Sequence, residues 1–168
     1  MSRELAIGLT IALAVVILAA MSFAWRRRIR RDAGLTAPLG VPEHAEVEDR
    51  VEVLYVATTR HDQPLERLAV APLTYRARGE LVLTDRGAAL SLDGSPTVFL
   101  AAERLLAADL ATVAIDRVVE PDGLIRLQWR EPSGVIVDSF LRVAHDAPQQ
   151  TLAALQRLCA APESGASE

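Results

Sequence analysis

The first part of the chain is dominated by one uninterrupted apolar run. Residues 5–25 form 21 consecutive positions without a charged side chain, and five arginines follow within the next six positions. At about 1.5 Å of rise per residue, a helix of this length extends for about 31 Å, enough to cross a hydrocarbon core of roughly 30 Å. The pattern therefore predicts one transmembrane helix over residues 5–25, preceded by a tail at residues 1–4.

The arginine cluster at residues 26–31 is expected to orient this helix. Arginines are costly to translocate, so they hold their end of the helix on the cytoplasmic side. A cleaved signal peptide fits less well, because its apolar region usually spans only about 7–15 residues. We therefore expect the N-terminus outside and the rest of the chain in the cytoplasm, at the plasma (inner) membrane. The residues assigned to the membrane interface are Trp25, Arg26, Arg27, Arg28, Arg30 and Arg31.

After residue 31 the pattern changes twice. Residues 32–48 carry two glycines, two prolines and several acidic side chains, which predicts a linker. From Val51, β-branched and aromatic residues alternate with others as far as about Thr59, which is typical of a strand. We therefore expect a folded domain over residues 49–161.

Two hairpins stand out within this domain. Residues 80–84 and 88–92 flank the turn at 85–87, whose glycine can adopt the left-handed conformation that a short hairpin loop needs. Residues 124–130 and 135–143 flank a second turn with the sequence Pro-Ser-Gly. Both patterns predict strand, tight turn and returning strand.

Shorter elements are expected around these hairpins. A polar loop is predicted over 60–64, a short strand over 97–100, and a turn over 101–104 before a further strand. Residues 65–77 remain ambiguous, because Pro72 interrupts any regular element that forms there.

The domain is expected to end in one amphipathic helix. Asp146 is a natural N-cap, Pro162 ends the helix, and residues 162–168 form a polar tail. Its apolar face consists of Leu152, Leu155, Leu158 and Cys159. The predicted fold is therefore mainly β with a C-terminal α-helix. About seven antiparallel strands form a curved sheet or partly open barrel, and the helix covers its open end.

The charge distribution limits the binding partners. Residues 32–168 carry 12 arginines against 21 acidic residues, a net charge of about −9, so this part is a poor candidate for binding nucleic acid or a highly anionic lipid surface. We expect no nucleic-acid partner. The single cysteine, Cys159, excludes an intramolecular disulfide, and its place on the apolar face predicts a packed thiol. All 18 basic residues are arginine, a bias typical of GC-rich genomes such as those of actinobacteria.

No catalytic constellation stands out in the sequence. His44, His61 and His145 are far apart and lack metal-ligand spacing, so we expect surface positions for them. His61 beside Asp62 could serve acid–base chemistry, but no nucleophile, oxyanion motif or second carboxylate pair accompanies it. Glycine-rich phosphate loops and zinc patterns are absent from the sequence. We therefore expect neither an enzyme nor a cofactor or metal.

Four arginines are the candidates for ligand binding. They are Arg60, Arg67, Arg76 and Arg78. Clustered cations near the first hairpin could form an anion site, whereas the acidic neighbours Asp62, Glu66 and Glu80 favour a solvated surface with local ion pairs.

The order of strands followed by one helix is that of pleckstrin-homology-like (PH-like) folds, and several segments resemble one family more closely. They are Tyr55-Val56-Ala57-Thr58-Thr59-Arg60, Leu65-Glu66-Arg67-Leu68, Glu80-Leu81-Val82-Leu83-Thr84-Asp85-Arg86-Gly87, Leu127-Gln128-Trp129 and Asp138-Ser139-Phe140-Leu141-Arg142. The chain resembles a family of small actinobacterial membrane proteins with one N-terminal span and a PH-like domain. This family usually has glycine where Ser139 stands here. The resemblance implies no catalytic or binding residues.

Two functions follow as hypotheses. The first is a membrane-anchored, non-enzymatic interaction module that binds a protein or peptide partner through its strand edges. The second is a binder of a lipid headgroup or a small anionic ligand. Membrane lipids are expected to contact the anchor and the arginine cluster. Gly8 and Ala12 could support pairing of two spans and so a homo-oligomer. Small residues are common in membrane-spanning helices, and we favour the interpretation that these two have no role in pairing.

Overall fold

The computed structural model divides the chain into two compact units, Met1–Gly34 and Leu35–Glu168, which we describe separately. The residues described below are 3–32, 37–42, 44–68, 71–111, 113–114, 117–118, 123–143 and 148–160.

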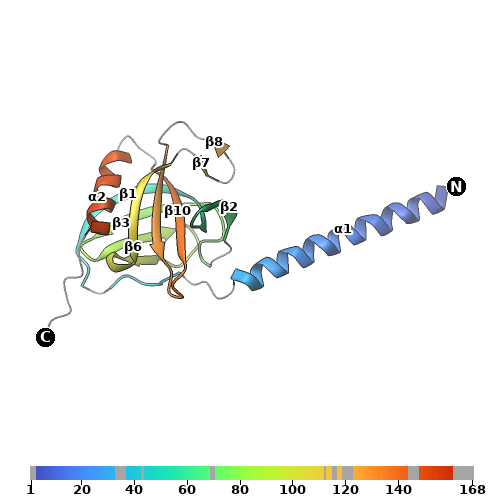
Figure 1. The fold of residues 1–168 in the computed structure, drawn as a ribbon, viewed down its shortest axis with the longest axis horizontal. Coiled ribbons are helices and arrows are strands. Elements are labelled where there is room, and N and C mark those ends of the chain that lie inside the picture. The colour runs from blue at the N-terminus through green and yellow to red at the C-terminus, as the bar shows by residue number, and fades with distance from the viewer. Residues whose placement is uncertain are drawn as a thin grey trace. The chain divides into compact units, whose positions relative to one another are not determined.

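The first unit contains one helix, α1 (Arg3–Asp32), drawn in blue in Figure 1. Its stretch Ile7–Arg27 is long and apolar enough to cross a membrane by length and composition, with a mean hydropathy of 2.5. None of that stretch is buried against protein. An N-terminal helix of this length and composition is compatible with a membrane anchor.

The second unit is an antiparallel sheet with one helix, in agreement with the fold class predicted from the sequence (Figure 1). The strands of the large sheet are β1 (Val47–Arg60), β2 (Gln63–Arg67), β3 (Ala77–Thr84), β4 (Gly87–Leu92), β5 (Val98–Ala101), β6 (Leu105–Ala111), β9 (Leu124–Arg130) and β10 (Ile136–Val143). They follow the order β5-β4-β3-β1-β10-β9-β6, and β2 pairs with β1 outside this path. A separate two-stranded sheet comprises β7 (Val113–Ala114) and β8 (Arg117–Val118), and the 3₁₀ helix η1 spans Ala102–Arg104.

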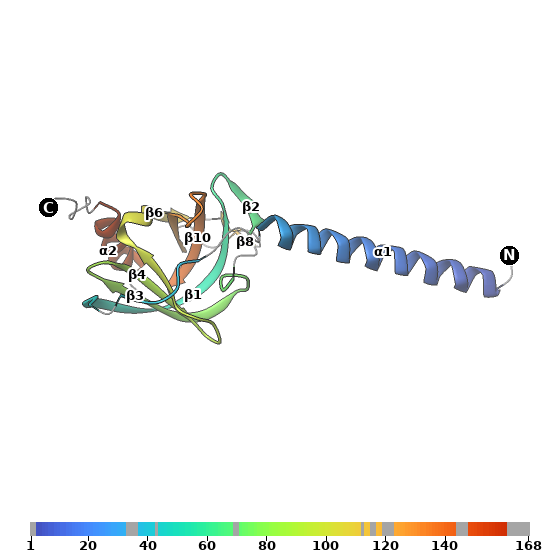
Figure 2. The same ribbon diagram turned by 90° about the horizontal axis from the view of Figure 1, so that it is seen from below.

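The C-terminal helix α2 (Pro148–Ala160) covers the core beside β6, as both ribbon views show (Figures 1 and 2). Leu155 and Leu158 are buried in the main core cluster together with inward residues of the sheet. The Gln156 side-chain amide donates to the Ala108 carbonyl of β6 at 3.0 Å. The predicted N-cap, Asp146, lies outside the described residues.

Both predicted hairpins are confirmed, as β3–β4 and β9–β10. The turn at 101–104 and the strand that follows it are confirmed as η1 and β6. The polar loop predicted over 60–64 is present but shorter than expected: β1 continues to Arg60, β2 begins at Gln63, and only His61 and Asp62 connect them. Asp62 makes this tight connection possible because it adopts a φ of +61°, a left-handed conformation that aspartate tolerates better than most residues.

A β-bulge in β1 decides which of its side chains face the core. The register with β10 shifts between Tyr55 and Ala57, so Thr58 rather than Ala57 shares an inward row with Ser139. The strand therefore brings the Thr58 hydroxyl into the buried interior, 2.7 Å from that of Ser139.

Part of the predicted linker lies against the sheet. The Phe99 amide donates to the Pro38 carbonyl at 2.9 Å, and the Gly40 amide donates to the Thr97 carbonyl at 3.2 Å. Leu39 thereby bridges Val98 in antiparallel fashion and pairs with the otherwise open edge of β5. The chain thus covers one of its own sheet edges, a common protection against edge-to-edge aggregation.

Candidate functional site

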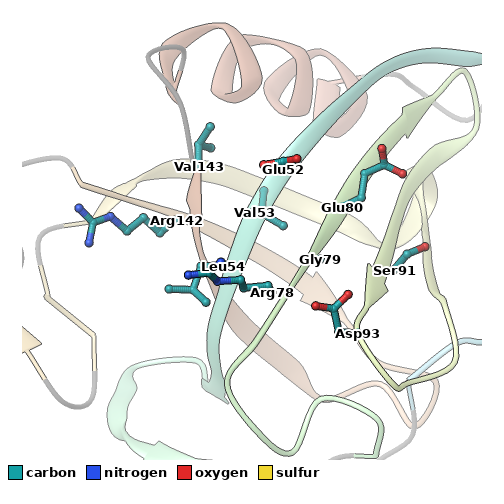
Figure 3. Close-up of a pocket in the computed structure, with 10 residues that line it drawn as sticks. All are labelled: Glu52, Val53, Leu54, Arg78, Gly79, Glu80, Ser91, Asp93, Arg142 and Val143. Atoms are coloured by element: carbon teal, nitrogen blue, oxygen red, sulfur yellow. The ribbon is translucent and has the colours of Figure 1, made fainter.

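A groove on the outer face of the sheet is a candidate binding site in the part of the chain described here. It has a volume of about 860 Å³ and crosses four strands, β10, β1, β3 and β4, or their ends. Figure 3 shows the residues that line it: Glu52, Val53, Leu54, Arg78, Gly79, Glu80, Ser91, Asp93, Arg142 and Val143.

The centre of the groove is a cross-strand row of three residues. Leu54 of β1 is paired with Arg142 of β10 on one side and with Arg78 of β3 on the other. Neighbouring strands lie about 4.8 Å apart, so the Cα atoms of the two arginines are about 10 Å from each other. An apolar side chain is thus flanked by two cations.

The guanidinium groups of Arg78 and Arg142 are available to a ligand. Both side chains are exposed, and neither makes an ion pair or hydrogen bond with another residue that the structure describes. In Figure 3 the Arg78 side chain extends beside Leu54, while the end of Arg142 points away from the centre of the groove. Two unpaired guanidinium groups on a sheet favour carboxylate or phosphate ligands.

The next row along the strands carries the opposite charge. Glu52 of β1 is directly opposite Glu80 of β3, and Glu80 is opposite Ser91 of β4. Like charges in directly opposed positions destabilise a sheet. Arg50 offsets part of this repulsion through a 3.0 Å ion pair with Glu80. The groove therefore presents a basic row beside an acidic row, about 7 Å apart along the strands.

Gly79 allows β3 and β4 to approach closely at the edge of the groove. A Cβ atom at this position would lie 2.1 Å from the Ser91 carbonyl oxygen and 2.9 Å from the Leu92 Cα. Backbone atoms cannot move away from such a contact without disturbing the strand pairing, so only glycine fits. This residue permits the close approach of β3 and β4 beside Arg78.

The structure does not gather the four candidate arginines into one site. Arg78 lines the groove. Arg76 is exposed just before β3 and does not line the groove. Arg60 lies six residues beyond Leu54 on β1, which corresponds to about 20 Å of strand. The Arg67 guanidinium donates to the Val56 carbonyl at 3.0 Å and so contacts the bulge of β1.

Sequence reasoning did not single out Arg142, which the structure pairs with Leu54 in the groove. Arg142 ends the segment Asp138-Ser139-Phe140-Leu141-Arg142, which was noted only for its resemblance to a family. The one signal for an outward position is the alternation along β10, in which Leu141 is buried and Arg142 is exposed. Its distance of 64 residues from Arg78 in the chain hides their relationship.

A second polar cluster lies on the outer face near the β1–β2 turn. His61 Nδ1 is 3.2 Å from both carboxylate oxygens of Asp138, and it is 2.7 Å from the Gln128 amide nitrogen. Asp138 is buried, with 5% of its side chain exposed, whereas His61 is one-third exposed. Among the described residues no group of three or more His, Cys, Asp or Glu side chains is arranged to hold a metal ion.

The remaining candidates are distributed as follows. Cys159 packs against the main core, and burial raises the pKa of its thiol, so a reactive thiolate is disfavoured there. His44 is exposed, and His145 lies outside the described residues. The six residues expected at the membrane interface all belong to α1, where 52% of Trp25 is exposed.

The sequence matches the bacterial PH domain-like family over residues 36–157. The chain belongs to that family. The match begins before the segment that pairs with β5 and ends within α2, so it includes every strand that the structure describes. No curated protein matches the chain.

One similar solved structure is the solution structure of the C-terminal phosphotyrosine interaction domain of APBB2 from mouse. The alignment covers 75% of this chain and 95% of that chain, with 12% sequence identity and a TM-score of 0.49.

Proposed function

We propose that the chain is a single-pass, membrane-anchored interaction module without enzymatic activity. Its PH-like domain binds a protein or peptide partner at the cytoplasmic face of the plasma membrane, as a scaffold or accessory subunit. The observation that carries this proposal is the outer-face groove, in which the unpaired Arg78 and Arg142 flank the apolar Leu54.

The groove is suited to binding rather than to turnover. It combines an apolar contact with cations and carboxylates in fixed rows, which can recognise a partner by shape and charge. Among the residues that the structure describes, the groove is lined by one hydroxyl group, that of Ser91, and this hydroxyl is 3.0 Å from the Thr97 hydroxyl, which is not a base that could activate it. Membership of the family supports the same conclusion, since PH-like domains are typically interaction modules.

The anchoring part of the proposal rests on α1. Its apolar stretch ends at the arginine cluster, and that charge asymmetry favours a cytoplasmic location for the PH-like domain. We propose the division made from the sequence, with a span at 5–25, a linker at 32–48 and a domain at 49–161. The pairing of Leu39 with β5 indicates that the domain also uses part of the linker.

Site-specific photocrosslinking in native membranes tests the proposal. A photoreactive amino acid in place of Leu54, in the full chain, is expected to give a reproducible adduct with one protein. The same substitution at Glu103, an exposed residue of η1 outside the groove, serves as the control. Identical results at both positions, or no adduct at either, would contradict the proposal.

An alternative function is binding of a lipid headgroup or small anionic ligand through Arg60, Arg67, Arg76 and Arg78. Its specific support is the exposed sequence Tyr75-Arg76 just before β3, two residues from Arg78, because exposed tyrosine and arginine side chains suit a membrane interface. The full chain in neutral nanodiscs would then bind anionic vesicles, and the R76E/R78E variant would not. Equal binding by both proteins excludes this alternative.

A further inference from the structure

We propose that the outer-face groove recognises an acidic amphipathic helix of the partner protein. Two carboxylates at positions i and i+7 of that helix bind Arg78 and Arg142, and an apolar side chain between them packs against Leu54. This inference rests on the proposed function and specifies the chemistry of the partner.

The spacing of the arginine Cα atoms is compatible with a helical ligand. Their Cα atoms are separated by two strand spacings, about 10 Å. On a helix, residues i and i+7 share one face and lie about 10.5 Å apart, with residue i+3 or i+4 between them. An extended peptide offers about 7 Å between residues i and i+2, or about 13 Å between i and i+4. The i, i+7 distance on a helix is therefore closest to the Cα separation of Arg78 and Arg142.

Leu54 supplies the apolar contact at the middle of this row. It is half-buried on the outer face, while its neighbours Val53 and Tyr55 are buried in the core. A ligand side chain at i+3 or i+4 would remove the exposed part of Leu54 from water at the point where both salt bridges form. Partial exclusion of water strengthens such charge pairs.

The acidic row beside the arginines argues against a bilayer as the occupant. Three acidic residues line the same groove. Glu52 and Glu80 lie two residues along their strands from Leu54 and Arg78, and Asp93 lies beside Arg78 at the end of the arginine row. A flat anionic surface would bring negative charge over both rows at once. A helix can direct its carboxylates to the arginine row and basic or neutral residues to Glu52, so it avoids that repulsion.

A designed peptide provides the probe for this inference. The full chain is held in neutral nanodiscs, and a labelled alanine-based peptide of about four turns carries Glu at i and i+7 and Leu at i+4. Matched peptides replace both Glu residues by Gln or by Lys, or move them to positions i and i+2. Fluorescence anisotropy measures binding of each peptide to each protein variant.

The wild-type chain is expected to bind the i, i+7 Glu peptide at least tenfold more tightly than the Gln, Lys and i, i+2 peptides. R78E/R142E should lose about tenfold in affinity for the Glu peptide and gain affinity for the Lys peptide. R157E removes an exposed arginine of α2 that does not line the groove, so its binding should be unchanged. The exchange of preference between Glu and Lys peptides cannot result from partial unfolding.

Several outcomes would overturn the inference. Equal binding of the Glu and Gln peptides, a preference for the i, i+2 peptide, or unchanged binding by R78E/R142E would each do so. Self-association of the chain that R78E/R142E abolishes would also do so, because the occupant of the groove would then be a second copy of the chain. A partner crosslinked from Leu54 combined with no binding of the Glu peptide leaves the proposed function standing and refutes only this inference. Peptide binding without any adduct in membranes refutes the proposed function instead.

Discussion

The indole Nε1 of Trp129 donates a hydrogen bond of 2.9 Å to the hydroxyl of Ser139 on the neighbouring strand. The Ser139 hydroxyl is in turn 2.7 Å from that of Thr58, and Thr58 is 2.9 Å from the Tyr55 hydroxyl. Tyr55 completes the series by donating to the Leu73 carbonyl at 2.8 Å. Each hydroxyl can accept one bond and donate the next, so the buried polar groups from Trp129 to Leu73 are satisfied together.

Replacing Ser139 by alanine should destabilise the domain by about 1–3 kcal/mol, because the Trp129 N–H and the Thr58 hydroxyl would both lose a buried partner. Urea denaturation of the full chain in detergent, followed by Trp fluorescence, measures the change. S95A is the matched control: Ser95 lies in the β4–β5 turn, and its change should stay within about 0.5 kcal/mol. A double-mutant cycle with T58V should give a coupling energy clearly different from zero. Additive effects would contradict the shared network.

Tyr55 predicts how stability changes at high pH. Burial raises the pKa of its hydroxyl above the usual value of a tyrosine, so the folded state keeps a proton that the unfolded state releases. Because the folded state then binds more protons, the free energy of unfolding should fall as the pH rises above about 10. Below that range Tyr55 is protonated in both states and contributes no slope.

The comparison of wild type with Y55F isolates this effect. Y55F should be less stable near neutral pH, because the Leu73 carbonyl and Thr58 lose their partner, but it should lose less further stability above pH of about 10. Denaturant midpoints at a series of pH values give both slopes. Parallel slopes for the two proteins would show that Tyr55 does not carry the dependence.

Arg67 predicts a change in stability rather than in binding. Its guanidinium donates to the Val56 carbonyl at the bulge of β1, and Val56 is the residue that lets Thr58 turn inward. R67M keeps most of the aliphatic part and removes that donor, so it should cost about 1–2 kcal/mol. R76M is the control, because Arg76 is exposed. Loss of anion binding by R67M with no loss of stability would instead support a ligand-binding Arg67.

The parts of the fold that could be predicted are those encoded locally. The hairpin around 85–87 contains alternating strands and a glycine that the turn requires, since Gly87 adopts a φ of +150°. A Cβ at Gly87 would also lie 2.2 Å from the Leu100 carbonyl oxygen, so the same residue permits the approach of β5. Helix α2 was equally clear, because the spacing of its leucines matches a helical face.

The groove could not be predicted because it depends on pairings between distant segments. Arg142, Leu54 and Arg78 meet only because β1 lies between β10 and β3. The bulge of β1 then reverses the inward and outward positions beyond residue 55, which no local pattern indicates. The pairing of Leu39 with Val98 was equally hidden, because it rests on two backbone hydrogen bonds in a segment without periodicity.

The orientation of α1 gives the last prediction. Five arginines follow its apolar stretch within six residues, whereas residues 1–4 carry only Arg3 and Glu4 as charged side chains. Since positive charge resists translocation, a reporter fused after Glu168 that works only in the cytoplasm should be active, and one that works only outside should be silent. Neutral residues in place of the five arginines should weaken this orientation and divide the population between both topologies. An active external reporter on the unmodified chain would place the groove outside the cell, where its partner would then have to be sought.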